Sequence, residues 1–118
     1  MTVLLVVDDE VDIVDTFRFI LELEGYEVMT ALNGEEALKR VRQQRPDLII
    51  SDMMMPVLNG IALCRELRRH EETQTIPIIL SSSAIPSAEN RYWDVFIRKP
   101  ADLHSLLLDI RMLLDGRA

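Results

Sequence analysis

The chain has few of the residues that mark disulfide-bonded, secreted or membrane proteins. Cys64 is the one cysteine among 118 residues, which excludes an internal disulfide framework and fits a reducing compartment. No apolar run approaches the roughly 20 residues that a membrane-spanning helix needs. The N-terminal segment MTVLLVVDDE lacks the basic start of a secretory signal peptide. We therefore predict a cytoplasmic protein without membrane association.

Basic residues are scarce in the first half of the chain. Residues 1–60 hold twelve acidic and five basic residues, whereas residues 61–118 hold eight of each. The net charge of −7 therefore belongs to the first half. Binding of nucleic acid requires a positively charged surface that contacts the phosphates. The excess of acidic residues therefore argues against nucleic acid as a ligand of the domain. It is compatible with a divalent cation or with a basic partner surface.

Apolar runs of strand length alternate with helical patterns along the chain. Four of the five runs are continuously apolar, as expected for parallel strands that are covered on both faces. The alternation predicts a single domain over residues 1–118 with an α/β, doubly wound (βα)5 flavodoxin-like fold and a parallel five-stranded sheet of order 2-1-3-4-5. The five runs are 3–7, 28–31, 48–50, 78–80 and 95–97.

The connection after the fourth run is irregular. Residues 81–92 (SSSAIPSAENRY) contain a proline and show little amphipathic period. We therefore expect the fourth helix to be shortened, irregular or absent. The last helix, in contrast, has a clear stripe of leucine and isoleucine from Leu103 to Leu114.

Polar side chains follow four of the apolar runs. In a doubly wound sheet the carboxyl ends of the strands meet at one edge, where ligands bind. Three carboxylates at that edge would raise one another's pKa, a conflict that a hard cation such as Mg²⁺ removes, and a lysine with a hydroxyl beside them suits a phosphoryl group. Taken singly, each acid is equally well explained as a helix N-cap. The residues are Asp8 and Asp9, Asp52, Ser81 to Ser83, and Arg98 to Pro100.

These motifs resemble the receiver domain of two-component response regulators, over essentially the whole chain. The resemblance rests on VVDDE at 6–10, SDMMMP at 51–56, PIILSS at 77–82 and KP at 99–100. Pro56 and Gly60 stand four and eight positions beyond Asp52, and Ser82 stands thirty beyond it, as in the receiver pattern.

The resemblance implies a role for each matching residue. Asp52 would be the phosphoacceptor. Mg²⁺, which Mn²⁺ can replace, would be bound directly by Asp9, Asp52 and the backbone carbonyl of Met54, and by Asp8 mainly through water. The remaining positions are Ser82 and Lys99 as the groups that bind the phosphoryl oxygens, Phe96 as the aromatic switch, and Pro56, Gly60 and Pro100 as structural residues, with the Lys99–Pro100 peptide bond cis.

The resemblance also implies partners. A sensor histidine kinase or a phosphotransfer protein would donate the phosphoryl group, and a downstream effector domain or protein would read the result, with a homodimer as a further possibility. The chain would act as a signalling switch that catalyses its own phosphotransfer and slow autodephosphorylation, not as a metabolic enzyme.

Several residues depart from the family pattern. Met54 and Ala84 occupy positions whose side chains adjust phosphoryl lifetime, and neither can orient a hydrolytic water, so we predict slow autodephosphorylation. Tyr92 and Trp93 are expected to fill the space left by a shortened fourth helix. Leu108 and Met112 lie one turn apart, off the main leucine stripe of the last helix. They are either scattered apolar surface or a contact patch for a second protomer or a downstream element.

Three other functions fit the sequence less well. A pseudo-receiver that binds partners without phosphorylation would be expected to lose an acid, the hydroxyl or the lysine, and none is lost. An aspartyl-phosphate hydrolase would need a second acid two residues after its nucleophile, where this chain has Met54. A flavin or nucleotide binder would need a glycine-rich loop after the first strand, where this chain has DDEVD.

Overall fold

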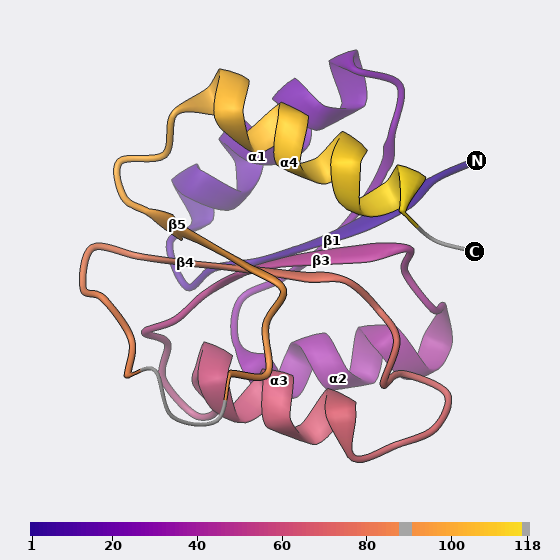
Figure 1. Ribbon diagram of the computed structural model, residues 1–118, viewed down its shortest axis with the longest axis vertical. Coiled ribbons are helices and arrows are strands. Elements are labelled where there is room, and N and C mark those ends of the chain that lie inside the picture. The colour runs from indigo at the N-terminus through magenta and orange to yellow at the C-terminus, as the bar shows by residue number, and fades with distance from the viewer. Residues whose placement is uncertain (88–90, 117–118) are drawn as a thin grey trace.

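The computed structural model, which describes residues 1–87 and 91–116, has a parallel sheet between two layers of helices (Figure 1). The strand order is β2-β1-β3-β4-β5, which confirms the predicted fold class. Helices α1 and α4 cover one face of the sheet, and α2 and α3 cover the other (Figure 1). The strands are β1 (Val3–Val7), β2 (Glu27–Ala31), β3 (Leu48–Asp52), β4 (Ile78–Ser82) and β5 (Val95–Arg98), and the helices are α1 (Val11–Leu23), α2 (Gly34–Gln43), α3 (Gly60–Arg68) and α4 (Leu103–Asp115).

The three central strands, β1, β3 and β4, each contain a continuous apolar run because both faces of the sheet are buried there. Every residue of β1 and β3 is buried. Successive side chains along a strand point to opposite faces, so each strand contributes to two cores. Leu4 and Ile50 belong to the core under α1 and α4. Leu5 and Leu80 belong to the core under α2 and α3.

Asparagine side chains start both helices of the α2–α3 layer. The Asn33 side chain accepts a hydrogen bond from the Glu36 amide at 2.8 Å, and the Asn59 side chain accepts one from the Ala62 amide at 2.8 Å. Each bond satisfies a backbone donor that the first helical turn leaves without a partner. The two helices therefore begin at fixed residues beside the carboxyl edge of the sheet.

The connection between β4 and β5 has no helix in its described part, residues 83–87 and 91–94. This confirms the expectation of a missing or shortened fourth helix for those residues; residues 88–90 of the predicted irregular stretch lie outside the described part. Trp93, only 6% exposed, packs in the core beneath α3, and Tyr92 packs against the same core. The two aromatic side chains thus fill space on this face, as predicted.

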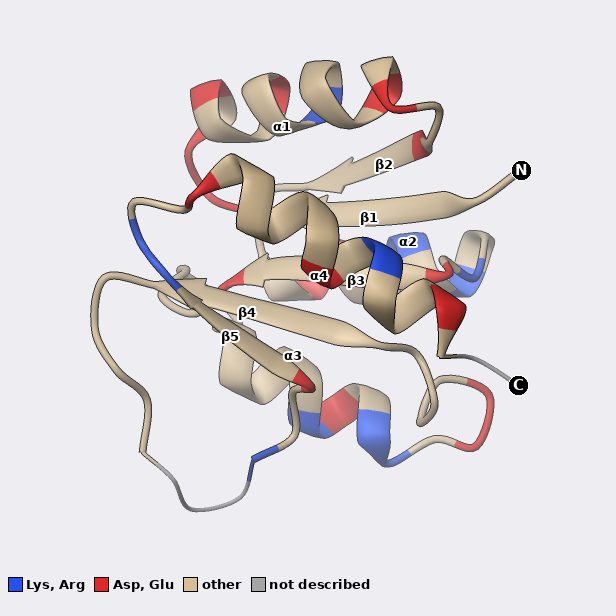
Figure 2. Cartoon of the chain, turned by 45° about the horizontal axis from the view of Figure 1, so that its top comes forward, with Lys and Arg blue, Asp and Glu red and all other residues tan. Residues whose placement is uncertain are grey.

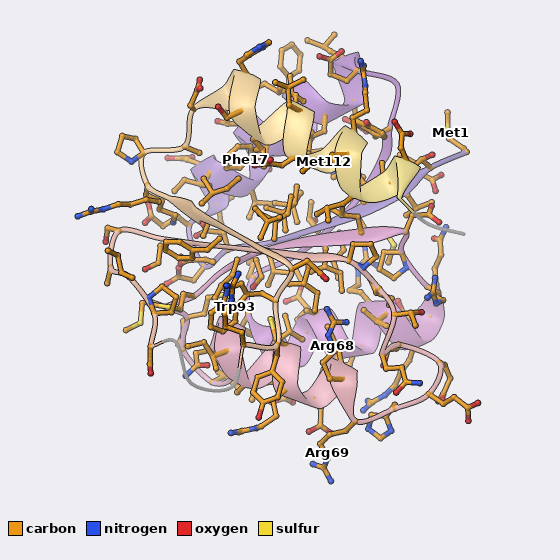
Figure 3. All side chains as sticks on the ribbon, in the orientation of Figure 1. Met1, Phe17, Arg68, Arg69, Trp93 and Met112 are labelled. Atoms are coloured by element: carbon orange, nitrogen blue, oxygen red, sulfur yellow. The ribbon has the colours of Figure 1, made fainter. Side chains whose placement is uncertain are left out.

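Arg68, the last residue of α3, ties this connection to the rest of the fold (Figure 3). Its guanidinium donates hydrogen bonds of 2.8–3.0 Å to four acceptors, and only 20% of its side chain is exposed. The bonded Asp94 oxygen also accepts the amide of Ile78 at 2.7 Å. The four acceptors are the carbonyls of Gln74, Ile76 and Tyr92 and the carboxylate of Asp94.

Among the helices of the described residues, none combines the length and the apolar character that crossing a bilayer requires.

Candidate functional site

Three carboxylates meet at the carboxyl edge of the sheet. Strands β1 and β3 are parallel neighbours, and Val7 pairs with Ser51, so the next residues, Asp8 and Asp52, lie side by side. One oxygen from each of Asp8, Asp9 and Asp52 falls within 4.8 Å of the others. Asp8 is 4% exposed and Asp52 is 8% exposed, while Asp9 is open to solvent. The sheet therefore concentrates negative charge where two of the three groups have little water.

Lys99 bridges two of these carboxylates from the opposite side of the site. Its ammonium nitrogen lies 3.2 Å from Asp8 Oδ2 and 3.2 Å from Asp52 Oδ1. The Lys99 amide donates to the carbonyl of Ser82 at 2.9 Å, which continues the pairing of β5 with β4 beyond the strand end. The Lys99–Pro100 peptide bond is cis, as the family resemblance predicts. One lysine thus pairs with two of the three acids.

The electrostatics of the site follow from burial and from the close charges. Burial raises the pKa of the Asp52 carboxyl and the Asp8 carboxylate raises it further, so this pKa stays above its usual value although Lys99 lowers it. Burial opposes the charged form of Lys99, but Asp8 and Asp52 outweigh burial and raise the pKa of that ammonium. A single ammonium does not balance three carboxylates, and a second cation would.

Asp8 also forms a hydrogen bond next to the start of the first helix. Its Oδ1 accepts the amide of Glu10 at 2.9 Å, while Glu10, the N-cap residue of α1, makes no capping bond with its own side chain. Asp8 is therefore not the N-cap of α1, which is Glu10; it lies two residues earlier and accepts the amide of the N-cap residue itself. The other oxygen contacts Lys99, so the residue belongs to the charged cluster as well.

Ser82 and Phe96 lie on the two strands beside the acids. Ser82 ends β4 and is 2% exposed, and its hydroxyl oxygen accepts the amide of Ala84 at 3.2 Å. Phe96 pairs with Leu80 in the sheet and is half-buried against the core beneath α3. Ser82 therefore lies at the predicted edge, but its hydroxyl is bonded locally and not to Asp52.

Gly60 allows the start of α3 to pack directly on the end of β3. A Cβ atom at this position would collide with the carbonyl oxygen of Asp52 and come within 2.9 Å of Met53 Cα. The Gly60 amide donates to the Met53 carbonyl at 2.9 Å. Only glycine fits this approach, so the backbone of the candidate acceptor is set by contact with α3.

The methionines after Asp52 have different roles. Met53 is 7% exposed and belongs to the core, and Met55 packs against the same core, as predicted. The Met54 side chain is 66% exposed at the edge of the site. Only Met54 thus presents its side chain to solvent beside the acids.

Val57 has an unusual backbone conformation in the loop between β3 and α3. Its φ is 69°, in the left-handed region that β-branched residues rarely adopt. The Leu58 amide donates to the Pro56 carbonyl at 2.8 Å, which closes a three-residue turn around Val57. Pro56 therefore helps to form a strained turn four residues beyond Asp52.

The structure thus brings together Asp8, Asp9, Asp52 and Lys99 as the motifs predict. Sequence reasoning missed an apolar hollow of about 560 Å³ beside Lys99, lined in part by Ile13, Phe17 and Pro100. The helical spacing of Ile13 and Phe17 is the one signal for it in the sequence, and the same spacing is expected of residues that only pack in the core.

Comparison with known proteins agrees with the geometry. The sequence model of the response regulator receiver domain matches residues 4–111. The chain is 37% identical to the phosphate regulon transcriptional regulatory protein PhoB of Rhizobium meliloti over 114 residues, covering 92% of this chain and 50% of PhoB. It is 31% identical to protein PilH of Pseudomonas aeruginosa over 122 residues, covering 98% of this chain and all of PilH.

A solved structure is similar over the same range. The signal receiver domain of a signal transduction histidine kinase from Syntrophus aciditrophicus superimposes with a TM-score of 0.90 at 34% identity, covering 98% of this chain and 92% of that one. The chain spans half or less of the length of several curated relatives that it matches.

Proposed function

The chain belongs to the family of response regulator receiver domains of two-component systems, and from that premise we propose that Asp52 is its phosphoacceptor. The observation that carries the proposal is the bridge from Lys99 to Asp52 and Asp8, with oxygens of all three acids within 4.8 Å. We propose one receiver domain over residues 1–118, in which phosphorylation changes the surface that a partner reads.

The proposed reaction is phosphoryl transfer from a phosphohistidine. A carboxylate oxygen of Asp52 forms a bond to phosphorus while the bond from phosphorus to the imidazole nitrogen breaks, and the leaving imidazole keeps the electron pair and takes up a proton. Lys99 is already 3.2 Å from Asp52, so its ammonium lies where it would pair with the new phosphoryl oxygens. The rigid ends of β1 and β3 orient the nucleophile.

The donor atoms of the site fit Mg²⁺. Asp8, Asp9 and Asp52 offer only oxygens, which Mg²⁺ and Mn²⁺ prefer, and Lys99 leaves much of their charge unbalanced. We propose that Asp9, Asp52 and the Met54 carbonyl bind the ion directly and that Asp8 contributes mainly through water. When bound, the ion supplies positive charge that offsets the charge on the transferring group.

Ser82 and Phe96 would carry the switch. In the proposed phosphorylated state the Ser82 hydroxyl leaves the Ala84 amide and donates to a phosphoryl oxygen. Phe96 is half-buried, so its ring is able to change position without opening the fully buried core. Moving such an equilibrium from 1:99 to 99:1 requires about 5.5 kcal/mol of differential interaction. A phosphoryl group bonded by both Lys99 and Ser82 would contribute to that difference.

Met54 and Ala84 would make the phosphorylated state long-lived. Both side chains are exposed, and neither carries a polar atom that could orient an attacking water. We expect the double variant Met54→Asn/Ala84→Glu to lose its phosphoryl group faster than the wild type by about tenfold or more. Intact mass followed over time after removal of the phosphodonor measures the rate, and an unchanged rate contradicts this part of the proposal.

The partners remain proposals because the chain spans only part of several relatives. We propose a sensor histidine kinase or a phosphotransfer protein as donor and a downstream effector domain or protein as target, in the cytoplasm. A homodimer is one form that the output could take. No residue that the pseudo-receiver alternative expects to be lost is missing from the site, so nothing favours that alternative.

Chemical mapping tests the acceptor directly. The chain is incubated with Mg²⁺ and a small acyl-phosphate donor, and borohydride then reduces any aspartyl phosphate to homoserine. Peptide mass spectrometry is expected to find homoserine at position 52 alone. Homoserine at position 8 or 9 would show that the acceptor is assigned wrongly.

A further inference from the structure

The outer surfaces of α1 and α4 expose apolar side chains that neither the core nor the phosphoacceptor site uses. Phe19 and Leu23, one turn apart on α1, are 65% and 72% exposed. Leu108 and Met112, one turn apart on α4, are 52% and 61% exposed. We call this surface the α1–α4 face. Pairs of exposed large apolar residues at helical spacing on two neighbouring helices are a common property of docking surfaces.

A hollow also lies between the two helices, which distinguishes this surface from a set of scattered apolar residues. It has a volume of about 170 Å³ and is lined by Glu24, His104, Leu107, Leu108 and Arg111. Glu24 follows Leu23 at the end of α1, so the hollow lies next to Leu23 and includes Leu108, whereas Met112 lines a separate hollow with Arg45 and Asp94. Its size suits a single apolar side chain.

The charge around this face is mostly negative, although His104 and Arg111 line the hollow itself. Residues 10–24, which include α1 and its two ends, hold five acidic residues and one basic residue. Residues 102–115, which include α4, hold three acidic residues and one arginine. Most of the net charge of −7 therefore lies on this layer, and Figure 2 shows the acidic residues of α1 and its ends.

The opposite layer has the opposite charge. Residues 33–45 around α2 hold four basic and two acidic residues, and residues 59–70 around α3 hold three basic and one acidic (Figure 2). A basic partner is therefore attracted to the α1–α4 face and repelled from the α2–α3 layer. We therefore expect such a partner to bind the α1–α4 face and not the α2–α3 layer.

We propose that the α1–α4 face binds a basic amphipathic helix of another protein. The apolar stripe of that helix would cover Leu23 and Leu108, and its lysine or arginine residues would face the surrounding acids. A second copy of this chain fits less well, because a two-fold contact through this face would place the same acidic residues opposite each other. The surface lies outside the acid cluster and does not depend on phosphorylation.

The test uses the unphosphorylated chain and a fluorescent peptide of about 18 residues, made of leucine and lysine with leucine at helical spacing. The control peptide has the same composition in an order without a helical stripe. Fluorescence anisotropy at moderate salt should show binding of the striped peptide about tenfold tighter than binding of the control peptide. Equal affinities would mean attraction by charge alone and would overturn the proposal.

Matched variants locate the surface. Leu23→Ser/Leu108→Ser should weaken binding of the striped peptide by about tenfold or more, with an unchanged circular dichroism spectrum. Ile85→Ser removes a side chain that is 72% exposed outside the α1–α4 face, and it should leave the affinity unchanged. Equal losses in both variants would overturn the proposal. So would a wild-type dimer in sedimentation that the double variant lacks, because a second copy would then be the occupant.

Discussion

The connection from β3 to α3 and the connection from β4 to β5 are held in place by opposite means. The first is fixed by close backbone contact: Gly60 has no side chain, and the start of α3 therefore lies directly on the Asp52 carbonyl. The second has no helix in its described residues and depends on side chains, with Trp93 filling the core and Arg68 bonding three carbonyls. The backbone of Asp52, the proposed acceptor, is therefore positioned by close backbone contact with α3, while the neighbouring strands depend on a few long side chains.

Removal of Arg68 should have the largest effect. Arg68→Ala leaves three carbonyl oxygens and the Asp94 carboxylate without this donor, so we expect a loss of about 3 kcal/mol in the free energy of unfolding. Urea unfolding followed by circular dichroism and by the fluorescence of Trp93 measures the loss.

Arg69 provides the matched control for that measurement. Its guanidinium makes one exposed ion pair with Glu66 at 3.2 Å and points away from the core (Figure 3). Arg69→Ala should therefore change the free energy of unfolding by less than about 0.5 kcal/mol. Equal losses of unfolding free energy in the two variants would contradict this account, because the β4–β5 connection would then not depend on Arg68.

A single added methyl group should disturb the β3–α3 connection. Gly60→Ala places a Cβ atom against the Asp52 carbonyl, so we expect a loss of about 2 kcal/mol and slower phosphorylation by an acyl-phosphate donor. The control is Gly116→Ala, whose Cβ comes no closer than 3.4 Å to another atom. A Gly60→Ala variant with wild-type stability and wild-type phosphorylation rate would show that the close approach does not position the acceptor.

The smallest expected effect concerns Val57. Val57→Gly should raise the free energy of unfolding by about 1 kcal/mol, because glycine adopts a φ of 69° without the steric cost of a β-branched residue. Val57→Ala keeps a Cβ atom and should gain less than Val57→Gly. Thermal unfolding of the two variants beside the wild type gives the order, and a loss of stability in Val57→Gly would show that the turn is not strained.

The sequence predicts the sheet and the acid cluster well because both depend on local pattern. Alternation of apolar runs with helical stripes is enough to place Asp8 and Asp52 at adjoining strand ends. The helix missing from the described part of the β4–β5 connection was also predictable, since a proline and a lack of amphipathic period are visible in the chain.

Other features depend on contacts that local pattern does not contain. Nothing in the local sequence distinguishes Arg68 from Arg65 or Arg69. Its hydrogen-bond acceptors lie between Gln74 and Asp94, and they come close to it only in the folded protein. Position 57 is neither glycine nor asparagine, so the sequence does not indicate that its φ is positive. The bond from the Ala84 amide to the Ser82 hydroxyl is likewise a property of the folded loop.

The central claim is that Asp52 accepts a phosphoryl group with the help of a divalent cation, and intact mass tests it most directly. Wild type and Asp52→Ala are incubated with Mg²⁺ and a small acyl-phosphate donor, with and without a chelator. The account predicts a gain of one phosphoryl group in the wild type, no gain in Asp52→Ala, and no gain in either when the metal is chelated. A gain of one phosphoryl group in Asp52→Ala would contradict the assignment of the acceptor.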